Sequence, residues 1–230
     1  RFRISADGSL STPTAGTSNF RAGVNAGNSI LSGGNYNVVV GDDAGTALTT
    51  GDQNVAIGFQ ASKNQTTSAR NTVVGNQAAY GNLTGAENVY IGYGSGPNGV
   101  VNATADSSVA VGAFSLTALT TGDNNTAIGY KTGLAVTTGV GNSITGANAG
   151  LALSSGNYNT AVGLQALSTE TAGAASTAIG AGALQRQILG NTNDSNNVGV
   201  GYVAGTKVTT GTNNVLLGRA AYNVTTETIT

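Results

Sequence analysis

A five-residue pattern, Asn-x-x-(Val/Ile)-Gly with few departures, recurs along the chain, most often at intervals of 17 residues. A fixed period of this kind is typical of repeat proteins, in which each copy is one structural unit that stacks on its neighbours. Gly closes all eleven copies, and Asn opens nine of them. The copies are Asn37–Gly41, Asn54–Gly58, Asn71–Gly75, Asn88–Gly92, Ser108–Gly112, Asn125–Gly129, Asn142–Gly146, Asn159–Gly163, Ser176–Gly180, Asn197–Gly201 and Asn214–Gly218. Asn19–Gly23 has the features of a degenerate first copy.

The second half of each copy also keeps its phase. A small side chain follows the repeat Gly by three residues, and a polar segment, often Thr-Thr-Gly, comes next. Gly and Asn favour corners because they adopt positive φ at low cost. No segment has a sustained 3.6-residue period. We therefore predict a unit of strand, Gly corner, second short strand and Thr/Gly/Asn corner, with almost no helix. The small residues are Ala44, Ala61, Ala78, Ser115, Thr132, Ala149, Ala166, Ala183, Ala204 and Ala221.

The first strand of each copy has two apolar faces. In the copy at 54–58, Val55 and Ile57 point to one side and Ala56 points to the other, because side chains alternate along a strand. One face fills the coil interior, and the other would be exposed to water in a single chain. Burial of this second face in a symmetric homo-oligomer is the simplest explanation. Successive Asn side chains are predicted to form a ladder that hydrogen-bonds along the stack.

Composition restricts the possible partners. Of 230 residues 36 are Gly and 39% are hydrophobic, mostly small, which favours a thin core. The net charge of −1 comes from scattered residues, so no concentrated basic surface for nucleic acid is expected. No apolar run reaches the roughly 20 residues of a membrane span, so no membrane insertion is expected. Cys is absent, which excludes disulfides and thiolate metal sites. Because the chain starts with Arg, we expect a fragment or a processed product.

Several copies resemble a known repeat. Residues 125–130 (Asn-Thr-Ala-Ile-Gly-Tyr), 108–112 and 176–181 are similar to the head repeats of trimeric autotransporter adhesins. The longer form, Asn-Thr-Ala-Ile-Gly-Tyr followed by Thr-Thr-Gly-x-x-Asn, is similar to repeats of bacteriophage tail fibres. Residues 1–9 resemble a short strand-turn segment that precedes such repeats in fibre proteins. The resemblance covers about residues 19–224. It implies a left-handed parallel β-roll and three chains packed around a common axis. The 17-residue unit is slightly longer than that of the adhesin heads.

The fold expected is therefore an all-β parallel β-solenoid, assembled as an intertwined or side-by-side homotrimer. Residues 1–18 form a short strand-turn entry segment, 19–224 form the solenoid of about eleven 17-residue repeats, and 225–230 form an exit segment. Two breaks in the period place loop insertions near 93–106 and 181–196. Insertions in repeat proteins map to loops that often bind ligands, and loops without function are an equal alternative.

The sequence predicts no catalytic, cofactor-binding or metal-binding residue, and no cofactor. His and Cys are absent, so Ser-His and Cys-His pairs cannot form. A glycosidase needs two carboxylates, but the ten present do not share one repeat phase, and adjacent Asp42 and Asp43 would point apart on a strand. A solvated surface role is the favoured interpretation. Neither Gly92–Gly96 nor Gly139–Gly141 leads into a helix, as a dinucleotide loop would, and Asp is too sparse for calcium-binding nonapeptides.

Two rows of side chains have alternative interpretations. The threonine pairs could form an ice-binding face, although their place beside Gly favours hydrogen bonding within a corner. The aromatic residues could stack on sugar rings, although covering the coil edge and an interchain seam is favoured. The pairs are Thr49/Thr50, Thr66/Thr67, Thr120/Thr121, Thr137/Thr138 and Thr209/Thr210, and the aromatic residues are Phe59, Tyr93, Tyr130 and Tyr202 in one phase and Tyr36 and Tyr158 in another.

The function expected is that of a structural fibre or adhesin segment, which spaces and presents a host-attachment tip and contacts surface glycans. Other fibre or tail proteins and host-surface polysaccharide are the expected partners. The expected location is a virion tail or, alternatively, a bacterial cell surface. A polysaccharide-depolymerising tailspike and an ice-binding solenoid are the alternative functions.

Overall fold

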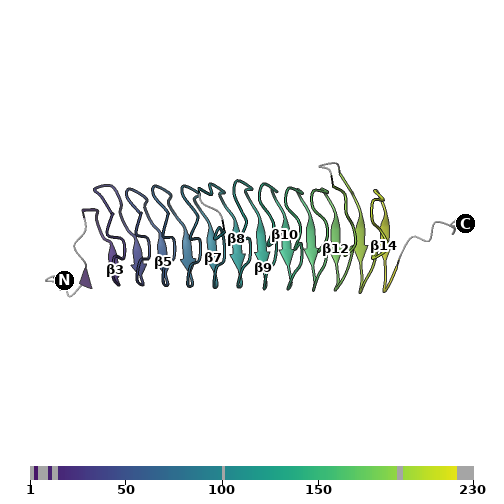
Figure 1. Ribbon diagram of the computed structural model, residues 1–230, viewed down its shortest axis with the longest axis horizontal. Helices are drawn as coiled ribbons and strands as arrows, with labels where there is room; N and C mark the ends of the chain where they lie inside the picture. The colour runs from purple at the N-terminus through teal and green to yellow at the C-terminus, as the bar shows by residue number, and fades with distance from the viewer. Residues whose placement is uncertain (1–2, 5–9, 12–14, 100–101, 191–193, 222–230) are drawn as a thin grey trace, which may run out of the picture. The chain divides into compact units, whose positions relative to one another are not determined.

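The computed structural model describes residues 3–4, 10–11, 15–99, 102–190 and 194–221. These residues form strands and turns and no helix, and the chain divides into two compact units, Arg1–Thr121 and Gly122–Thr230. In both units the strands lie side by side in chain order (Figure 1). The expected parallel β-solenoid of about eleven turns is confirmed.

The first unit contains eight strands. A short antiparallel pair precedes the coil, and six three-residue strands then pair in parallel, each with the strand of the next turn. Equivalent repeat positions are always partners, as Val55, Ala56 and Ile57 pair with Thr72, Val73 and Val74. The strands are β1 (Arg3–Ile4), β2 (Leu10–Ser11), β3 (Phe20–Ala22), β4 (Val38–Val40), β5 (Val55–Ile57), β6 (Thr72–Val74), β7 (Val89–Ile91) and β8 (Val109–Val111).

The second unit repeats this arrangement with six strands. All pairings are parallel and join equivalent positions of successive turns, across the 21-residue step between β12 and β13 as well. The strands are β9 (Thr126–Ile128), β10 (Ser143–Thr145), β11 (Thr160–Val162), β12 (Thr177–Ile179), β13 (Val198–Val200) and β14 (Val215–Leu217). Residues 222–230, which include the predicted exit segment, lie outside the described part.

The predicted second short strand is wrong: consecutive turns follow each repeat Gly instead. Gln60 and Ser62 have left-handed φ values of 57° and 50°, which no β-strand contains. Backbone hydrogen bonds within a turn alternate here with hydrogen bonds between turns. Ala61 N donates to Gly58 O of its own turn (3.2 Å), and Ser62 N donates to Ala78 O of the next turn (3.0 Å). Left-handed residues here include many types other than Gly and Asn, because hydrogen bonds between turns stabilise that conformation.

The repeat Gly is required for two reasons. Gly58 has a φ of +133°, and a Cβ atom there would lie 2.6 Å from the carbonyl carbon of Gly75 in the next turn. A side chain would therefore strain the backbone and collide with the adjacent turn. The close approach of successive turns at this corner explains why Gly closes every copy.

The coil interior is lined by the middle residue of each strand and by the small residue after the repeat Gly. Ala56 and Ala61 are both buried, and Leu48 fills the opposite corner. Val55 and Ile57 point outward, as predicted from alternation along the strand. Small interior residues suit this core because each turn encloses little space.

A ladder of Asn side chains runs through each unit, as predicted. Asn54 Nδ2 donates to Asn37 Oδ1 of the preceding turn (3.1 Å) and to Ser68 O (2.9 Å). Asn54 Oδ1 accepts the backbone N–H of Asn71 in the following turn (3.0 Å). The side chain is buried, so these bonds satisfy polar groups that water does not reach.

We predict that Asn54→Ala lowers the free energy of unfolding by about 2–4 kcal/mol, because it leaves several buried partners unsatisfied. Asn54→Ser should cost less, since Ser occupies this position in the copies at 108 and 176. Exposed Asn28 provides the control, and Asn28→Ala should change stability by less than about 0.5 kcal/mol. Urea denaturation measures all three, and equal effects of Asn54→Ala and Asn28→Ala would contradict a structural role for the ladder.

Candidate functional site

Acidic residues of the first unit mainly hold successive turns together. Asp42 Oδ1 accepts the N–H of Val24 from the preceding turn at 2.8 Å. Asp52 Oδ1 accepts the N–H of Asn35 in the same way at 2.6 Å. Asp106 Oδ1 accepts the N–H of Ala86 at 2.7 Å. These bonds give the carboxylates a structural role at the coil surface.

Asp43 belongs to a polar cluster that spans three turns. Its carboxylate accepts Asn25 Nδ2 (3.1 Å) and Lys63 Nζ (3.2 Å), with Gln60 Nε2 at 3.5 Å. Hydrogen bonds from Asn25 first, then from Lys63 and Gln60, lower the pKa of Asp43 from its ordinary value. Asp42 and Asp43 lie in a turn, so the expectation of a strand there is wrong. The two carboxylates nevertheless contact different partners, Val24 N for Asp42 and the Asn25 and Lys63 side chains for Asp43.

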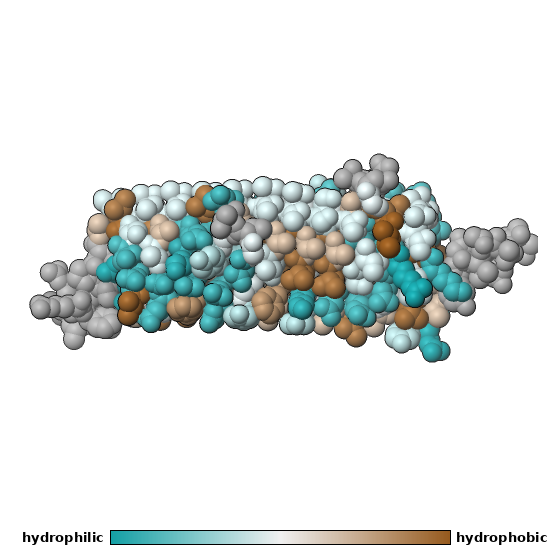
Figure 2. All heavy atoms as spheres, in the orientation of Figure 1, coloured by the Kyte–Doolittle hydropathy of each residue, from teal (hydrophilic) through white to brown (hydrophobic). Residues whose placement is uncertain are grey.

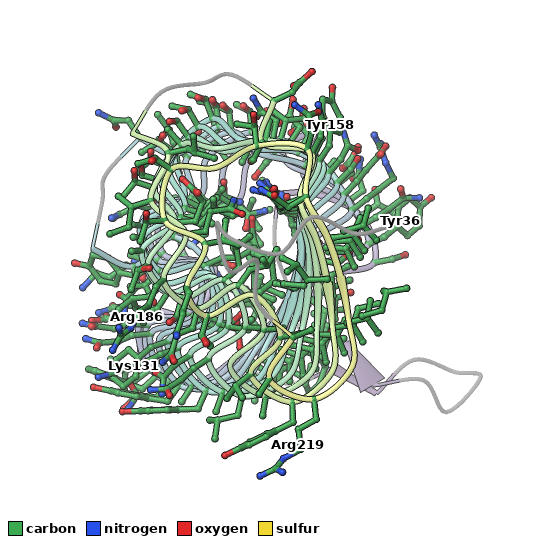
Figure 3. All side chains as sticks on the ribbon, turned by 90° about the vertical axis from the view of Figure 1, so that its right-hand side faces the viewer. Tyr36, Lys131, Tyr158, Arg186 and Arg219 are labelled. Atoms are coloured by element: carbon green, nitrogen blue, oxygen red, sulfur yellow. The ribbon has the colours of Figure 1, made fainter. Side chains whose placement is uncertain are left out.

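No group of three or more His, Cys, Asp and Glu in the described part of the chain could hold a metal ion. The same residues include no helix that is long and apolar enough to cross a membrane. In the second unit, Lys131 and Arg186 lie on one side of the coil and Arg219 projects from another side (Figure 3). Hydrophilic and hydrophobic side chains are interspersed on the face in Figure 2.

The threonine pairs form corner hydrogen bonds, as favoured from the sequence. The first hydroxyl of a pair donates along the stack, as from Thr49 Oγ1 to Thr66 O (3.1 Å) and from Thr137 Oγ1 to Ser154 O (3.1 Å). The second Thr of each pair is exposed. The exposed residues of the five pairs are Thr50, Thr67, Thr121, Thr138 and Thr210.

The aromatic residues lie at the outside of the coil. Tyr158 projects outward in Figure 3. Tyr93 packs edge-to-face against Phe114, with ring centroids 5.0 Å apart. Lys131 Nζ lies 5.3 Å from the ring centroid of Tyr130. These rings are partly exposed apolar surfaces with polar neighbours, which suits either an interchain seam or contact with a sugar ring.

The first insertion accompanies a change inside the coil. Tyr90 occupies the middle strand position, where other copies carry smaller residues, and it is buried. A Cβ atom on Gly96 would lie 2.7 Å from Cδ1 of Tyr90, so this Gly makes room for the ring. Ser95 Oγ donates to Ala110 O at 2.8 Å, and Asn82 bridges to Ala103 across the insertion. Residues 100–101 lie outside the described part.

The second insertion is tied to a buried carboxylate, Glu170. One oxygen, Oε1, accepts the N–H groups of residues 171–173 at 2.8–3.1 Å. The N–H of Leu189 lies within 3.2 Å of both oxygens, and Gln187 Nε2 donates to Oε2 at 2.9 Å. Glu170 therefore anchors the start of the insertion inside the coil. Residues 191–193 lie outside the described part.

Gln187 supplies the side-chain hydrogen bonds that the Asn ladder lacks where Ser176 replaces Asn. Its Nε2 donates to Ser176 Oγ (3.0 Å), and its Oε1 accepts Asn197 Nδ2 (2.9 Å). Neither Glu170 nor Gln187 was identified from the sequence. A partial signal was present, because both stand at a position seven residues after the repeat Gly that holds apolar residues such as Leu119 and Leu153 in several other copies, and Glu170 is the only charged residue at that position.

We predict that Glu170→Leu lowers the free energy of unfolding by about 3–5 kcal/mol, because it leaves several buried N–H groups without an acceptor. The variant should also speed proteolytic cleavage within residues 185–196. Glu87→Gln is the control, since Glu87 pairs with Arg70 at the surface, and its effect should stay below about 1 kcal/mol. Unchanged stability and cleavage in Glu170→Leu would exclude the anchoring role.

The most extensive candidate interaction surface in each unit is the outer strand face, defined as the first and third residues of strands β4 to β8 in the first unit and β9 to β14 in the second. These positions hold Val, Ile, Leu, Thr or Ser in every copy and never a charged residue. Many are exposed: Ile57, Ile91 and Ile128 are 37%, 38% and 42% accessible. This face is uncharged in every turn and carries an apolar residue in every turn except that of β10, where Ser143 and Thr145 stand, which is typical of a protein contact surface.

Comparison with known proteins gave no match to a protein-family model, to a curated protein or to a solved structure.

Proposed function

We propose that this chain is a structural segment of a bacteriophage tail fibre or of a bacterial surface adhesin, which spaces and presents a host-attachment tip. The uninterrupted turn-to-turn bonding of each unit supports a mechanical role, because the same contacts recur in every turn. The use of carboxylates as caps for backbone N–H groups agrees with it. The resemblance of residues 108–112, 125–130 and 176–181 to fibre and adhesin repeats gives the proposal its biological setting.

The outer strand face carries the proposal of a homotrimer, either intertwined or side by side. Water contact with this apolar face is unfavourable, by about 25 cal/mol for each Å² that a partner could cover. The face repeats once per turn, so a partner that covers all of it must have the same axial period of about 4.8 Å. A further copy of the chain has that period. Other fibre or tail proteins would then join the assembly at its ends.

Contact with host-surface polysaccharide is the second part of the proposal. The insertions near 93–106 and 181–196 and exposed rings such as Tyr36 and Tyr158 are the candidate contacts, because aromatic faces stack on sugar rings. Within the repeat, these insertions and tyrosines occupy positions other than the first and third strand residues that form the outer strand face.

Measuring the mass of the native particle tests the assembly. We expect three times 22.5 kDa by light scattering at micromolar concentration. Ile57→Asp combined with Ile91→Asp should weaken association at least about tenfold, because each buries an unpaired charge in the seam. Ile188→Asp is the matched control, since Ile188 is exposed on the second insertion, and it should leave the mass unchanged. A monomeric wild-type protein would rule out the trimer.

Ice binding is a second candidate function, favoured by one observation. Exposed Thr residues recur at one phase in five successive turns of the first unit: Thr50, Thr67, Thr84, Thr104 and Thr121. Thermal hysteresis of the purified protein, lost in Thr67→Lys, would support this function. Freezing behaviour equal to that of an inert protein at the same concentration would exclude it.

A further inference from the structure

The residue directly after each repeat Gly, here called the Gly+1 position, alternates in size from turn to turn. A bulky apolar residue in one turn is followed by a small or polar residue in the next, without exception. The bulky set is Val24, Phe59, Tyr93, Tyr130, Leu164 and Tyr202, and the other set is Asp42, Asn76, Ala113, Ala147, Ala181 and Arg219. The coil repeats every turn, whereas this position repeats every two turns, or about 9.6 Å along the stack.

The outer strand face of the first unit follows the same two-turn period. Ile57 precedes Phe59 and Ile91 precedes Tyr93, and both isoleucines are exposed. The intervening turns carry Val74 and Val111 at that strand position, and these valines are less exposed. Bulky and small turns therefore alternate over two neighbouring surface positions. In the second unit Ile128 accompanies Tyr130 in the same way, but Ile179 precedes Ala181, so there only the Gly+1 position keeps the two-turn period throughout.

Nothing inside the coil requires a two-turn period. The interior residue three positions after Gly is Ala in most turns, strand pairing joins each turn to the next in the same manner, and the Asn ladder changes only at Ser108 and Ser176. The bulky Gly+1 side chains are 46–66% exposed, so they do not fill the core. The alternation must therefore match something outside the single coil.

We propose that the alternating Gly+1 residues fix the axial register between copies of this chain in the assembly. The inference rests on the proposed homo-oligomer and adds a specificity determinant to it. A closed symmetric assembly of parallel chains has no axial shift, so the bulky turns of neighbouring copies lie at the same level. A slip of one turn would place bulky turns against small ones throughout the seam and lose most of these contacts.

The size of an aromatic ring gives the alternation its steric reason. Paired rings pack with centroids about 4.5–7 Å apart, and adjacent turns, about 4.8 Å apart, lie at the short end of that range. Rings in every turn would stack on one another along one coil and leave little height for a ring from a second copy to pack between them. A small residue such as Ala113 or Ala147 between two bulky ones lets each layer of rings occupy the height of two turns.

A second copy fits the bulky set better than an extended polysaccharide does. Sugar stacking needs planar rings, but Leu164 and Val24 hold the same phase as the aromatic residues. The bulky side chains also continue the uncharged outer strand face, as Phe59 continues Ile57. A packing surface explains every member of the set, and a row of sugar-binding rings explains only four.

A phase-swapped variant of unchanged composition tests the proposal. It exchanges bulky and small Gly+1 residues in every turn from Phe59 onward, all of them exposed or half-buried, so that no two bulky turns become adjacent. Its substitutions are Phe59→Asn, Asn76→Phe, Tyr93→Ala, Ala113→Tyr, Tyr130→Ala, Ala147→Tyr, Leu164→Ala, Ala181→Leu, Tyr202→Arg and Arg219→Tyr. We expect it to fold and to form homo-oligomers of the wild-type mass, because all its copies share one phase.

Co-expression of the variant with the wild type, followed by native mass spectrometry, gives the decisive measurement. Hybrid particles should fall at least about fivefold below the statistical proportion, because the two phases mismatch in register. The control pairs wild type with Phe59→Tyr/Tyr93→Phe, which keeps the bulk and should mix statistically. Statistical mixing of the swapped variant would overturn the register proposal while leaving the oligomer intact. A monomeric wild type would overturn both the register proposal and the homo-oligomer. Retention of that monomer on a polysaccharide column, lost on substitution of Tyr93, would favour polysaccharide binding by the bulky residues instead.

Discussion

Hydrogen bonding along the stack is the interaction on which the rest of this structure depends. Each three-residue strand is too short to be stable alone, and each turn finds acceptors and donors in the turns before and after it. The bonds from Asn54 to both neighbouring turns show how one buried side chain joins three successive copies. Stability therefore accumulates from one turn to the next, as in other repeat proteins, and each turn must present the same groups at the same height.

This requirement explains the composition. Successive turns approach closely at the repeat Gly, so a side chain there would collide with the next turn. The enclosed space is narrow, so the interior uses Ala, Val and Leu and accepts a larger residue only where the neighbouring turn makes room, as Gly96 does for Tyr90. Many polar side chains form hydrogen bonds between turns. Backbone N–H groups donate to the carboxylates of Asp42, Asp52 and Glu170, so these acidic residues stabilise the coil.

The same architecture leaves its outer surface free to encode association. Inside the coil the turns do not alternate, whereas the Gly+1 position and part of the outer strand face distinguish alternate turns. A solenoid can vary these outer residues at little cost to folding, because they are exposed. In the proposed assembly, differences between turns on the outside therefore specify how copies align, while strand pairing remains the same from turn to turn.

The amino-acid sequence by itself determined the repeat, the strand positions, their inward and outward faces and the Asn ladder. These features follow from local periodicity and from one residue type recurring in phase, as in Asn37, Asn54 and Asn71. It did not determine the path after the repeat Gly, where left-handed residues such as Gln60 replace the expected strand. It also did not reveal that Glu170 holds the second insertion. Only the tertiary structure decided these points, because important partners belong to neighbouring turns that are distant in the chain: Gln60 N donates to Asp42 O, and Gln187 Nε2 donates to Glu170 Oε2.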